Sequence, residues 1–336
     1  MKVSVIGAGG WGTTLAVLLN ENGHEVTLWE FFKEYAEEMQ KTRENTKFLK
    51  GIKIPETISI TNDMKKAVET SQVLVMAVPS HVMRSALGSI KKFNYKNKII
   101  VSVTKGIEQE TLMRMSQVVQ KVLGKVKFCA LTGPSHAEEV SRKVPTVVVA
   151  ASKDRKTAQI IQHLFTADYF RVYTHKDLLG AELGGSIKNV IAIAAGVIDG
   201  LGAGDNTKAA LMTRGLAEMT RLGVRMGAKR ETFAGLAGMG DLIVTCASQH
   251  SRNRAVGELL GKGKKIAEIL NSMEMVAEGV KTTLSAYKLS KKYKVEMPIT
   301  EEIYNILYND KSAKDSIKSL MTRSPKSEQE FLQKKG

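Results

Sequence analysis

The first half of the chain alternates short apolar runs with longer amphipathic stretches. The short runs are rich in β-branched and aromatic residues and are therefore predicted strands. They are Lys2–Ile6, Glu25–Trp29, Ile58–Thr61, Val73–Val78, Ile99–Val103, Lys127–Leu131, Thr146–Ala151 and Tyr169–Tyr173. The stretches between them repeat apolar residues at helical spacing. The predicted helices are Gly12–Asn22, Glu34–Arg43, Val82–Ile90, Thr111–Val122 and Arg155–Leu164. Strands that alternate with helices of this length indicate βαβ units and a parallel sheet.

Two of the predicted strands, Val73–Val78 and Ile99–Val103, are apolar without alternation, which is typical of strands buried on both faces of a sheet. From about Leu178 the pattern changes, because helical periodicity continues without a convincing strand. The sequence therefore predicts an α/β fold class with two domains. A doubly wound N-terminal domain is expected over residues 1–178, and an all-helical C-terminal domain over residues 179–336.

The composition is that of an ordinary globular protein, with 43% hydrophobic and 25% charged residues in 336. Cys129 and Cys246 are the two cysteines; they exclude a disulfide framework and a Cys-based zinc site, and they fit a reducing compartment. The apolar run Val3–Ile6 leads directly into glycines and lacks the long apolar region of a signal peptide. The most apolar later stretch, Val190–Ile198, is shorter than the roughly 20 residues that a membrane span needs. We therefore expect a cytoplasmic protein without a membrane span.

The net charge changes this picture by suggesting an anionic partner. Lys and Arg number 50 and Asp and Glu number 34, which gives a formal charge of +16. Such an excess is compatible with nucleic acid, an acidic membrane or a phosphorylated small molecule. The basic residues are spread through the helical patterns, with no dense block and no interleaved aromatic residues. This distribution favours a phosphorylated metabolite, and we expect no nucleic-acid partner.

A glycine pattern stands directly after the first predicted strand and opens the first predicted helix. It consists of Gly7, Gly9 and Gly12, with Gly10 and Trp11 between the last two. The three spaced glycines allow a tight turn, a close approach of the backbone to a pyrophosphate, and close packing of helix on strand. The N-terminus of the helix adds free N–H groups and the positive end of its dipole. Because the pattern lies in a strand–turn–helix context, it predicts a Rossmann-type dinucleotide site.

Glu30 follows the second predicted strand, about 18 residues after Gly12. An acidic residue at this position accepts hydrogen bonds from the ribose hydroxyls and disfavours a 2′-phosphate. The alternative is a surface glutamate that begins a helix. Lys33 is close enough in sequence to attract a 2′-phosphate, so the choice between NAD and NADP stays open. Phe31 is interpreted as a flat surface for the adenine.

Three segments follow predicted strands, where ligands bind in doubly wound folds. They are Val78–Ser80, Thr104–Gly106 and Thr132–Ala137. Lys105 supplies a cation for an anionic substrate, and Gly133 and Ser135 supply backbone and hydroxyl donors. Taken singly, each could be a surface lysine or an ordinary turn. Because they share strand ends, we expect them to form part of a binding site.

Lys188 lies among small and apolar residues in the predicted helical stretch Leu183–Ala192. Burial of an ammonium among such residues lowers the pKa of the lysine toward neutrality. A lysine with such a pKa can act as a general acid or base. The alternative is a side chain that extends past its apolar neighbours to the surface.

A second polar group follows the glycine-rich run Gly235–Gly240. Asp241 comes directly after that run, and Ser251 and Arg252 follow ten residues later. Ser251 is suited to cap a helix, and the Arg252 guanidinium has the fork geometry that matches a phosphate. Capping alone would explain Ser251, and a solvated Arg is common. The six histidines are dispersed without metal-ligand spacing, so we expect no metal site.

Taken in order, these strings closely resemble the bacterial NAD(P)-dependent glycerol-3-phosphate dehydrogenases, and the resemblance covers essentially the whole chain. The strings that carry it are Gly7–Thr13, Val103–Glu108, Gly133–Ala137, Lys188–Asn189, Gly238–Leu242, Ser251–Asn253 and Val276–Gly279. The resemblance implies reversible hydride transfer between NAD(P)H and the middle carbon of dihydroxyacetone phosphate. The product, sn-glycerol 3-phosphate, would supply phospholipid synthesis. Dimers are usual among the proteins that the chain resembles.

The resemblance also implies roles for individual residues. Lys188 matches the proton acceptor and donor of the family and contacts the substrate. The other implied substrate contacts are Lys105, Gly133, Ser135, Asp241, Ser251, Arg252 and Asn253. The implied cofactor contacts, besides the glycine pattern and Glu30, are Gly10, Trp11, Phe31, Lys105, Ala137, Arg252, Val276 and Glu278.

Two residues depart from the family pattern. Gly10 stands where Ser is common. Phe31 stands where Arg or His is frequent, and this second departure argues against a strong preference for NADP. Two alternatives to the proposed class remain. A hydroxy-acid or hydroxyacyl-CoA dehydrogenase would need a different catalytic set, often a His–Glu pair in the acyl-CoA type, and no histidine here has a comparable helical position. A protein that binds NAD(H) without catalysis would not need Lys188, Asp241 or Ser251–Asn253.

Overall fold

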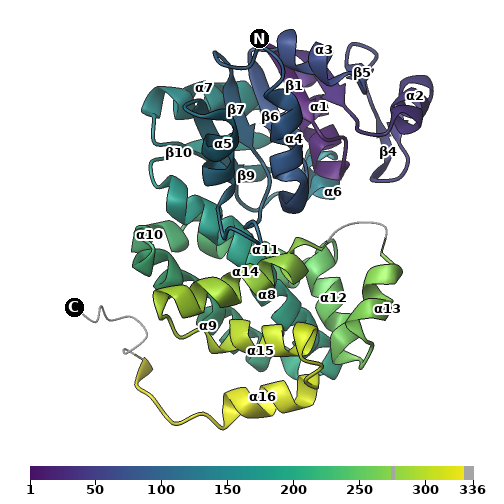
Figure 1. Ribbon diagram of the computed structural model, residues 1–336. Helices are drawn as coiled ribbons and strands as arrows, with labels where there is room; N and C mark the ends of the chain where they lie inside the picture. The colour runs from purple at the N-terminus through teal and green to yellow at the C-terminus, as the bar shows by residue number, and fades with distance from the viewer. Residues whose placement is uncertain (274–276, 329–336) are drawn as a thin grey trace. The chain divides into compact units, whose positions relative to one another are not determined.

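A computed structural model describes residues 1–273 and 277–328 (Figure 1). The chain divides into two compact units. The first comprises residues 1–108 and 113–178, and the second comprises residues 109–112 and the chain from residue 179 onward. The first unit is an α/β structure and the second is helical throughout its described part. The predicted fold class is therefore confirmed.

The first unit is built on one eight-stranded sheet. Its strand order is β10-β9-β8-β7-β6-β1-β2-β5. The strands are β1 (Lys2–Ile6), β2 (Glu25–Trp29), β5 (Ser59–Thr61), β6 (Val73–Met76), β7 (Ile99–Ser102), β8 (Lys127–Thr132), β9 (Thr146–Ala151) and β10 (Phe170–His175). The strand order reverses beside β1, so the glycine pattern after β1 stands where doubly wound folds bind their ligands.

Two strands, β9 and β10, run opposite to the rest of the sheet and break the predicted parallel arrangement. β9 pairs antiparallel with β8, with Thr132 opposite Val149, whereas every other pair in the sheet is parallel. The connection over residues 133–145 contains only the single-turn helix α6 (Ala137–Val140). A parallel crossover usually runs through a full helix, which this connection lacks, and the chain turns back along β8.

Helices cover both faces of the sheet (Figure 1). They are α1 (Gly10–Glu21), α2 (Lys33–Thr42), α3 (Met64–Glu69), α4 (Met83–Ile90) after the short 3₁₀ turn η1 (Ser80–Val82), α5 (Met115–Leu123), α6 and α7 (Arg155–Phe165). Two separate apolar cores result. Leu15 of α1 and Phe165 of α7 belong to one core, and Leu87 of α4 and Val119 of α5 belong to the other. Burial of strands on both faces explains their unbroken apolar runs.

Some elements of the first unit differ from the prediction. A small antiparallel hairpin, β3 (Glu44–Asn45) with β4 (Leu49–Lys53), was not predicted because its residues are mostly polar. Helix α5 begins at Met115, later than predicted, because Leu112 has a φ of 59° that a helix cannot contain. Helices α3 and α6 are too short to show a clear helical period.

The second unit consists of helices throughout its described residues (Figure 1). They are α8 (Leu178–Leu201), α9 (Gly204–Arg225), α10 (Arg230–Phe233), the π-helical turn η2 (Leu236–Gly240), α11 (Asp241–Ala247), α12 (Arg252–Gly261), α13 (Ile266–Asn271), α14 (Glu278–Tyr293), α15 (Pro298–Tyr308) and α16 (Ala313–Met321). Helix α8 is longer than the apolar stretch Val190–Ile198 suggested. Judged by length and composition alone, it is long and apolar enough to cross a membrane. Its most apolar window is completely buried in the protein, however, which is the setting of a core helix.

Glycines bring α8 and α12 into backbone contact. A Cβ on Gly196 would lie 1.9 Å from the carbonyl oxygen of Arg254, and a Cβ on Gly257 would lie 1.9 Å from that of Ile193. No side chain fits at either position, so the two helix axes approach as closely as backbones allow. This crossing fixes the start of α12 relative to the middle of α8, where Lys188 lies.

Candidate active site

The glycine pattern forms a tight loop between β1 and α1. Gly7 has a φ of +112°, and its N–H donates to the carbonyl oxygen of Trp29 at 3.0 Å. A Cβ on Gly12 would lie 1.9 Å from the carbonyl oxygen of Gly7, so this glycine closes the helix onto the loop. A Cβ on Gly9, by contrast, would meet nothing within 4 Å. The loop is therefore tightly packed on one side and open at Gly9.

The structure explains why glycine stands at position 10. A Cβ there would lie 2.6 Å from the carbonyl oxygen of Phe48, in the β3–β4 hairpin. The serine that the resemblance leads us to expect would not fit beside this carbonyl. Trp11 is partly buried against the core, with its ring 6.4 Å from that of Phe170.

Glu30 is not a surface residue at the start of a helix. Only 6% of it is exposed, and its Oε1 accepts the N–H of Phe32 at 3.1 Å. Burial raises the pKa of this carboxyl, and the backbone N–H groups of Phe32, Phe31 and Ala8 oppose the rise. The ring of Phe31 is 70% exposed and stands edge-on to Phe32. Lys33 is exposed and lies 3.9 Å from Glu37.

The predicted strand-end residues lie together in the first unit. The Lys105 Nζ donates to the carbonyl oxygen of Gly133 at 2.9 Å, and the Ser135 hydroxyl donates to the same oxygen at 3.0 Å. Ala137 begins α6, and its Cβ would lie 3.8 Å from a Cβ on Gly10. The Lys105 ammonium, the Ser135 hydroxyl and the glycine loop thus form one polar site at the carboxyl ends of the strands.

Lys188 is buried inside the second unit. It is 5% exposed, so the alternative of a side chain that reaches the surface is wrong. Its Nζ forms an ion pair with Asp241 and donates to the Thr245 hydroxyl at 2.6 Å. Asp241, predicted as a substrate contact, is 1% exposed and stands at the start of α11. Burial favours the neutral amine, whereas the carboxylate favours the ammonium, so two opposing influences act on one proton.

The start of α12 holds the remaining predicted group. Ser251 caps this helix, because its hydroxyl accepts the N–H of Arg254 at 3.2 Å. Arg252 is exposed in the first turn. Asn253 is buried, and its amide donates to the Asn189 Oδ1 at 3.0 Å and accepts the N–H of Gly279 at 2.8 Å.

These contacts link the neighbour of Lys188 on α8 to the starts of α12 and α14. Glu278 begins α14, and Val276 lies outside the described residues. Sequence reasoning did not select Thr245 and assigned Asn189 no role beyond the string Lys188–Asn189, because a threonine or asparagine in a helix gives no signal until its partner is known. No group of three His, Cys, Asp or Glu side chains suited to a metal occurs among the residues that the structure describes.

Comparison with known proteins decides the family. Models of the N-terminal and C-terminal parts of NAD-dependent glycerol-3-phosphate dehydrogenase match residues 2–158 and 177–318, respectively. The chain belongs to this family. Two bacterial members named glycerol-3-phosphate dehydrogenase [NAD(P)+], from Citrifermentans bemidjiense and a Thermoanaerobacter species, are each 54% identical to it. The alignments cover 97% and 98% of this chain and 98% and 99% of those proteins.

Solved structures of the family have the same fold. The glycerol-3-phosphate dehydrogenase of Coxiella burnetii is 36% identical with a TM-score of 0.93, and the alignment covers 96% of this chain and 99% of that one. The yeast enzyme is 28% identical with a TM-score of 0.81, covering 95% and 98%. The family assignment from the sequence motifs is therefore confirmed.

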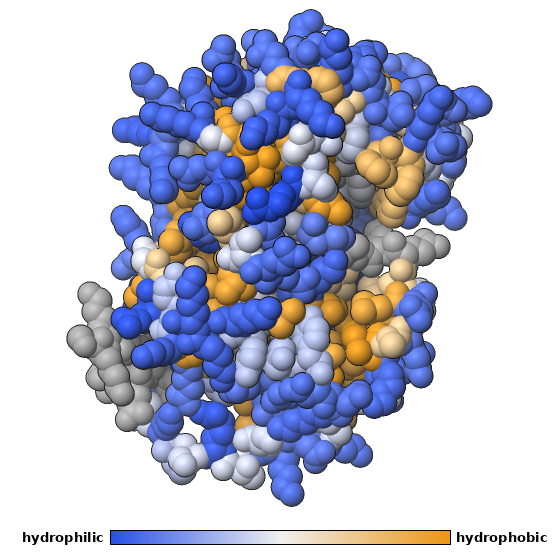
Figure 2. All heavy atoms as spheres, in the orientation of Figure 1, coloured by the Kyte–Doolittle hydropathy of each residue, from blue (hydrophilic) through white to orange (hydrophobic). Residues whose placement is uncertain are grey.

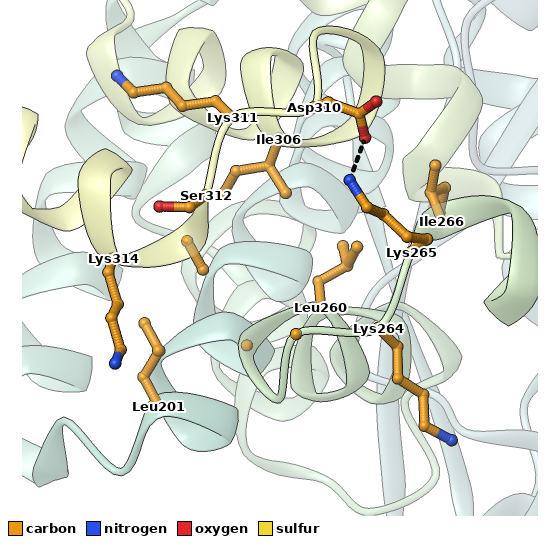
Figure 3. A pocket seen from close by; sticks show the side chains of 13 residues that line it. Leu201, Leu260, Lys264, Lys265, Ile266, Ile306, Asp310, Lys311, Ser312 and Lys314 are labelled. Atoms are coloured by element: carbon orange, nitrogen blue, oxygen red, sulfur yellow. Dashed lines mark hydrogen bonds and ion pairs between the residues drawn. The ribbon is translucent and has the colours of Figure 1, made fainter.

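The second unit also contains a pocket of about 260 Å³ away from these residues (Figure 3). Leu201, Leu260 and Ile306 line it with apolar atoms, and an ion pair of 3.0 Å joins Lys265 to Asp310 at its edge. None of the predicted cofactor or substrate residues lines it. The protein face drawn in Figure 2 is mainly hydrophilic, with hydrophobic side chains showing between the polar ones.

Proposed function

We propose that this chain reversibly reduces dihydroxyacetone phosphate to sn-glycerol 3-phosphate with NAD(P)H. Lys188 acts as the general acid and base. The observation that carries this proposal is the buried Lys188 amine, held between Asp241 and Thr245 in a member of the glycerol-3-phosphate dehydrogenase family. Burying a charged ammonium group costs free energy. Buried titratable groups that have a specific charged partner are found most often at sites of proton transfer.

The residues of the first unit fit a dinucleotide cofactor. The first turn of α1 contains no acidic residue and offers its N–H groups to a pyrophosphate, and the space beside Gly9 is open. The exposed ring of Phe31 suits the adenine. Glu30 suits the ribose hydroxyls of NAD. The exposed Lys33, three residues later in the sequence, suits the 2′-phosphate of NADP, so the proposal includes both cofactors. The cofactor, when bound, supplies the hydride.

Lys188 moves the proton that accompanies the hydride. In reduction its ammonium donates to the carbonyl oxygen on the middle carbon of the substrate. In oxidation the neutral amine accepts the proton of the hydroxyl group at that carbon. Asp241 stabilises the ammonium between these steps, and the hydroxyl of Thr245 limits the directions in which the amine can point.

Cationic groups hold the substrate phosphate. Arg252 is exposed at the N-terminus of α12, where the helix dipole also attracts an anion. Lys105 and Ser135 of the first unit are proposed as further substrate contacts on the ground of the family resemblance. Binding energy from the phosphate, which does not react, then orients the carbonyl group. The inferred substrate is therefore a small phosphorylated ketone.

We infer that the enzyme acts in the cytoplasm, where its product feeds glycerophospholipid synthesis. Both cysteines are buried free thiols, which fits a reducing compartment. A homodimer stays a prediction of the family resemblance.

Loss of NADH absorbance on addition of dihydroxyacetone phosphate tests the proposal. We expect turnover with this substrate, and much slower turnover with unphosphorylated dihydroxyacetone at the same concentration. Parallel assays with NADH and NADPH measure the cofactor preference. Equal rates with both ketones would contradict the proposed role of the phosphate, and no turnover with either would contradict the proposed reaction.

A further inference from the structure

Asn45 is a completely buried amide whose hydrogen-bonding capacity is fully used. It is 0% exposed. Its Nδ2 donates to the carbonyl oxygen of Ala8 and to the Thr13 hydroxyl, both at 2.7 Å. Its Oδ1 accepts the Tyr35 hydroxyl at 2.6 Å and the N–H of Phe48 at 3.1 Å. An amide side chain has two donor hydrogens and two acceptor lone pairs, so all four positions are occupied.

This network allows only one orientation of the amide. If the amide were turned over, Oδ1 would face the carbonyl oxygen of Ala8, and Nδ2 would face the N–H of Phe48. Two acceptors would meet in the first case and two donors in the second. The surroundings therefore hold the Asn45 amide in a fixed direction, and the amide holds Ala8 in turn.

Asn45 connects segments that are far apart in sequence. It lies in β3, and its partners lie in the glycine loop, in α1, in α2 and at the tip of the β3–β4 hairpin. The Tyr35 hydroxyl also accepts the N–H of Lys47, which adds a further bond to that tip. The hairpin thereby places the carbonyl oxygen of Phe48 against Gly10.

The bond to Ala8 has a consequence for the next peptide group. In a trans peptide the carbonyl of one residue and the N–H of the next point in opposite directions. The carbonyl oxygen of Ala8 is held inward by Asn45, so the N–H of Gly9 is directed to the opposite side. The backbone at Gly9 is also uncrowded, since a Cβ there would meet nothing within 4 Å.

We propose that Asn45 is a positioning residue for the cofactor pyrophosphate, because it fixes the Ala8–Gly9 peptide group so that the Gly9 N–H faces the bound phosphates. The inference rests on the proposed function, since it requires a dinucleotide cofactor in the glycine loop. It assigns the hairpin, whose sequence carries no recognisable phosphate motif, to the cofactor site.

Substitution of Asn45 by Leu tests the proposal without adding a charge near the phosphates. The variant keeps a similar volume but leaves the carbonyl oxygen of Ala8 with only the longer bond from the Thr13 hydroxyl, at 3.5 Å, so the peptide group is held less firmly. Binding is measured directly, by fluorescence titration with NADH and by competition with ADP, which carries a pyrophosphate without the nicotinamide. We expect the Kd for both ligands to rise about tenfold or more.

Asn22 provides a matched control. It is also an asparagine that joins two segments, because its Nδ2 donates to the carbonyl oxygens of Leu164 at 3.0 Å and Thr166 at 3.1 Å. It lies at the opposite end of α1 from the glycine loop. The Asn22→Leu variant is expected to lower the melting temperature and to leave the Kd for NADH and ADP within about twofold of the wild type.

Steady-state kinetics separate positioning from a general loss of structure. For Asn45→Leu the KM for NADH should rise, while kcat at saturating NADH and the KM for dihydroxyacetone phosphate stay within about threefold of the wild type. If Asn45→Leu does not fold, Thr13→Val is the second variant. It removes one partner of the Asn45 amide and should raise the Kd for NADH a few-fold, roughly in line with the loss of one buried hydrogen bond.

An unchanged Kd for NADH and ADP in a folded Asn45→Leu or Thr13→Val variant would overturn the proposal. So would a rise of equal size in Asn22→Leu. Failure of the proposed function would look different, because the wild-type protein would then not turn over dihydroxyacetone phosphate, whereas the Kd values of the variants would still report on Asn45.

Discussion

The glycine loop of the first unit and the lysine site of the second are built by opposite means. The loop is made of backbone, and a Cβ would collide at Gly7, Gly10 and Gly12. The lysine site is made of side chains, with an ion pair and a hydroxyl contact around one buried amine. The backbone site depends on the absence of side chains at positions that are close together in the sequence. The side-chain site depends on Asp241 and Thr245, which lie 53 and 57 residues after Lys188. The first is visible in a short string of sequence, and the second becomes visible only in the fold.

The largest effect is expected from removing the amine of the lysine site. Lys188→Ala should lower kcat by about 10² to 10⁴, because the developing alkoxide loses its proton donor. The Kd for NADH should stay within a few-fold of the wild type. Added small alkylamines should restore part of the activity.

Lys208→Ala is the matched control for this prediction. Lys208 is also a partly buried lysine in the second unit, where its Nζ lies 2.9 Å from both carboxylate oxygens of Asp199. We expect this variant to keep kcat within about threefold, since Asp199 retains its contact with Arg254. A Lys188→Ala enzyme with wild-type kcat would remove the amine from the mechanism.

The next largest effect is expected at a buried carboxyl group of the second unit, that of Glu218, and the two units differ in how their helices begin. Helix α1 begins on glycines, whereas α15 begins on a buried carboxylate of α9. Glu218 accepts the N–H groups of Ile299 at 2.6 Å and Thr300 at 3.1 Å. Burial raises the pKa of Glu218 to about 7.

A raised carboxyl pKa makes the fold bind this proton more tightly than the unfolded chain does. The resulting stabilisation is complete below about pH 4.5 and is lost as the pH rises through about 7, and it amounts to at most about 3 kcal/mol. Glu218→Gln should therefore flatten the fall in the free energy of unfolding between pH 5 and pH 8, measured by urea unfolding. Equal slopes for the variant and the wild type would show that Glu218 does not titrate in this range.

Two alanine variants separate packing from ligand contact within the glycine loop. Gly12→Ala should lower the free energy of unfolding by about 1–3 kcal/mol, because its Cβ meets the carbonyl oxygen of Gly7. Gly9→Ala should leave the melting temperature unchanged and raise the Kd for NADH, because its Cβ occupies the open space beside the loop. If Gly9→Ala bound NADH as well as the wild type, the pyrophosphate would not lie there.

The smallest effect is expected at an exposed residue that binds without reacting. Arg252→Ala should raise the KM for dihydroxyacetone phosphate about tenfold and change kcat less, since a phosphate contact contributes roughly 1–2 kcal/mol. Turnover of unphosphorylated dihydroxyacetone serves as the control and should not change. An unaltered KM for the phosphorylated ketone would contradict the assigned role of Arg252.

The parts of the fold that follow from local pattern were predicted correctly. Strands β1 and β2 match in every residue, because apolar runs between turn signals leave little choice. The reversal of β9 was missed, since strand direction depends on the length and path of the connection rather than on the strand itself. The hairpin was missed because its residues are mostly polar and because Asn45 joins it to partners that are distant in sequence.

The residues of the candidate site also divide into those that a local sequence pattern indicated and those that it did not. The loop glycines and Lys188 were selected from local strings. Asp241 was selected too, as a substrate contact, which stays a prediction, and the structure shows it paired with Lys188. Thr245 was not selected, and Asn189 was named only within the string Lys188–Asn189, without a role of its own. Their significance comes from α11 and α12 packing against α8, which no local pattern specifies.

The central claim is that the Lys188 amine exchanges a proton with the oxygen on the middle carbon of the substrate. A crystal structure of the complex with NAD+ and sn-glycerol 3-phosphate tests it most directly, through the distance from the Lys188 Nζ to that oxygen. We predict a separation of about 2.6–3.2 Å, within hydrogen-bond reach. An amine that remained bonded only to Asp241 and Thr245, with the substrate oxygen beyond the reach of both the amine and an intervening water, would contradict the account.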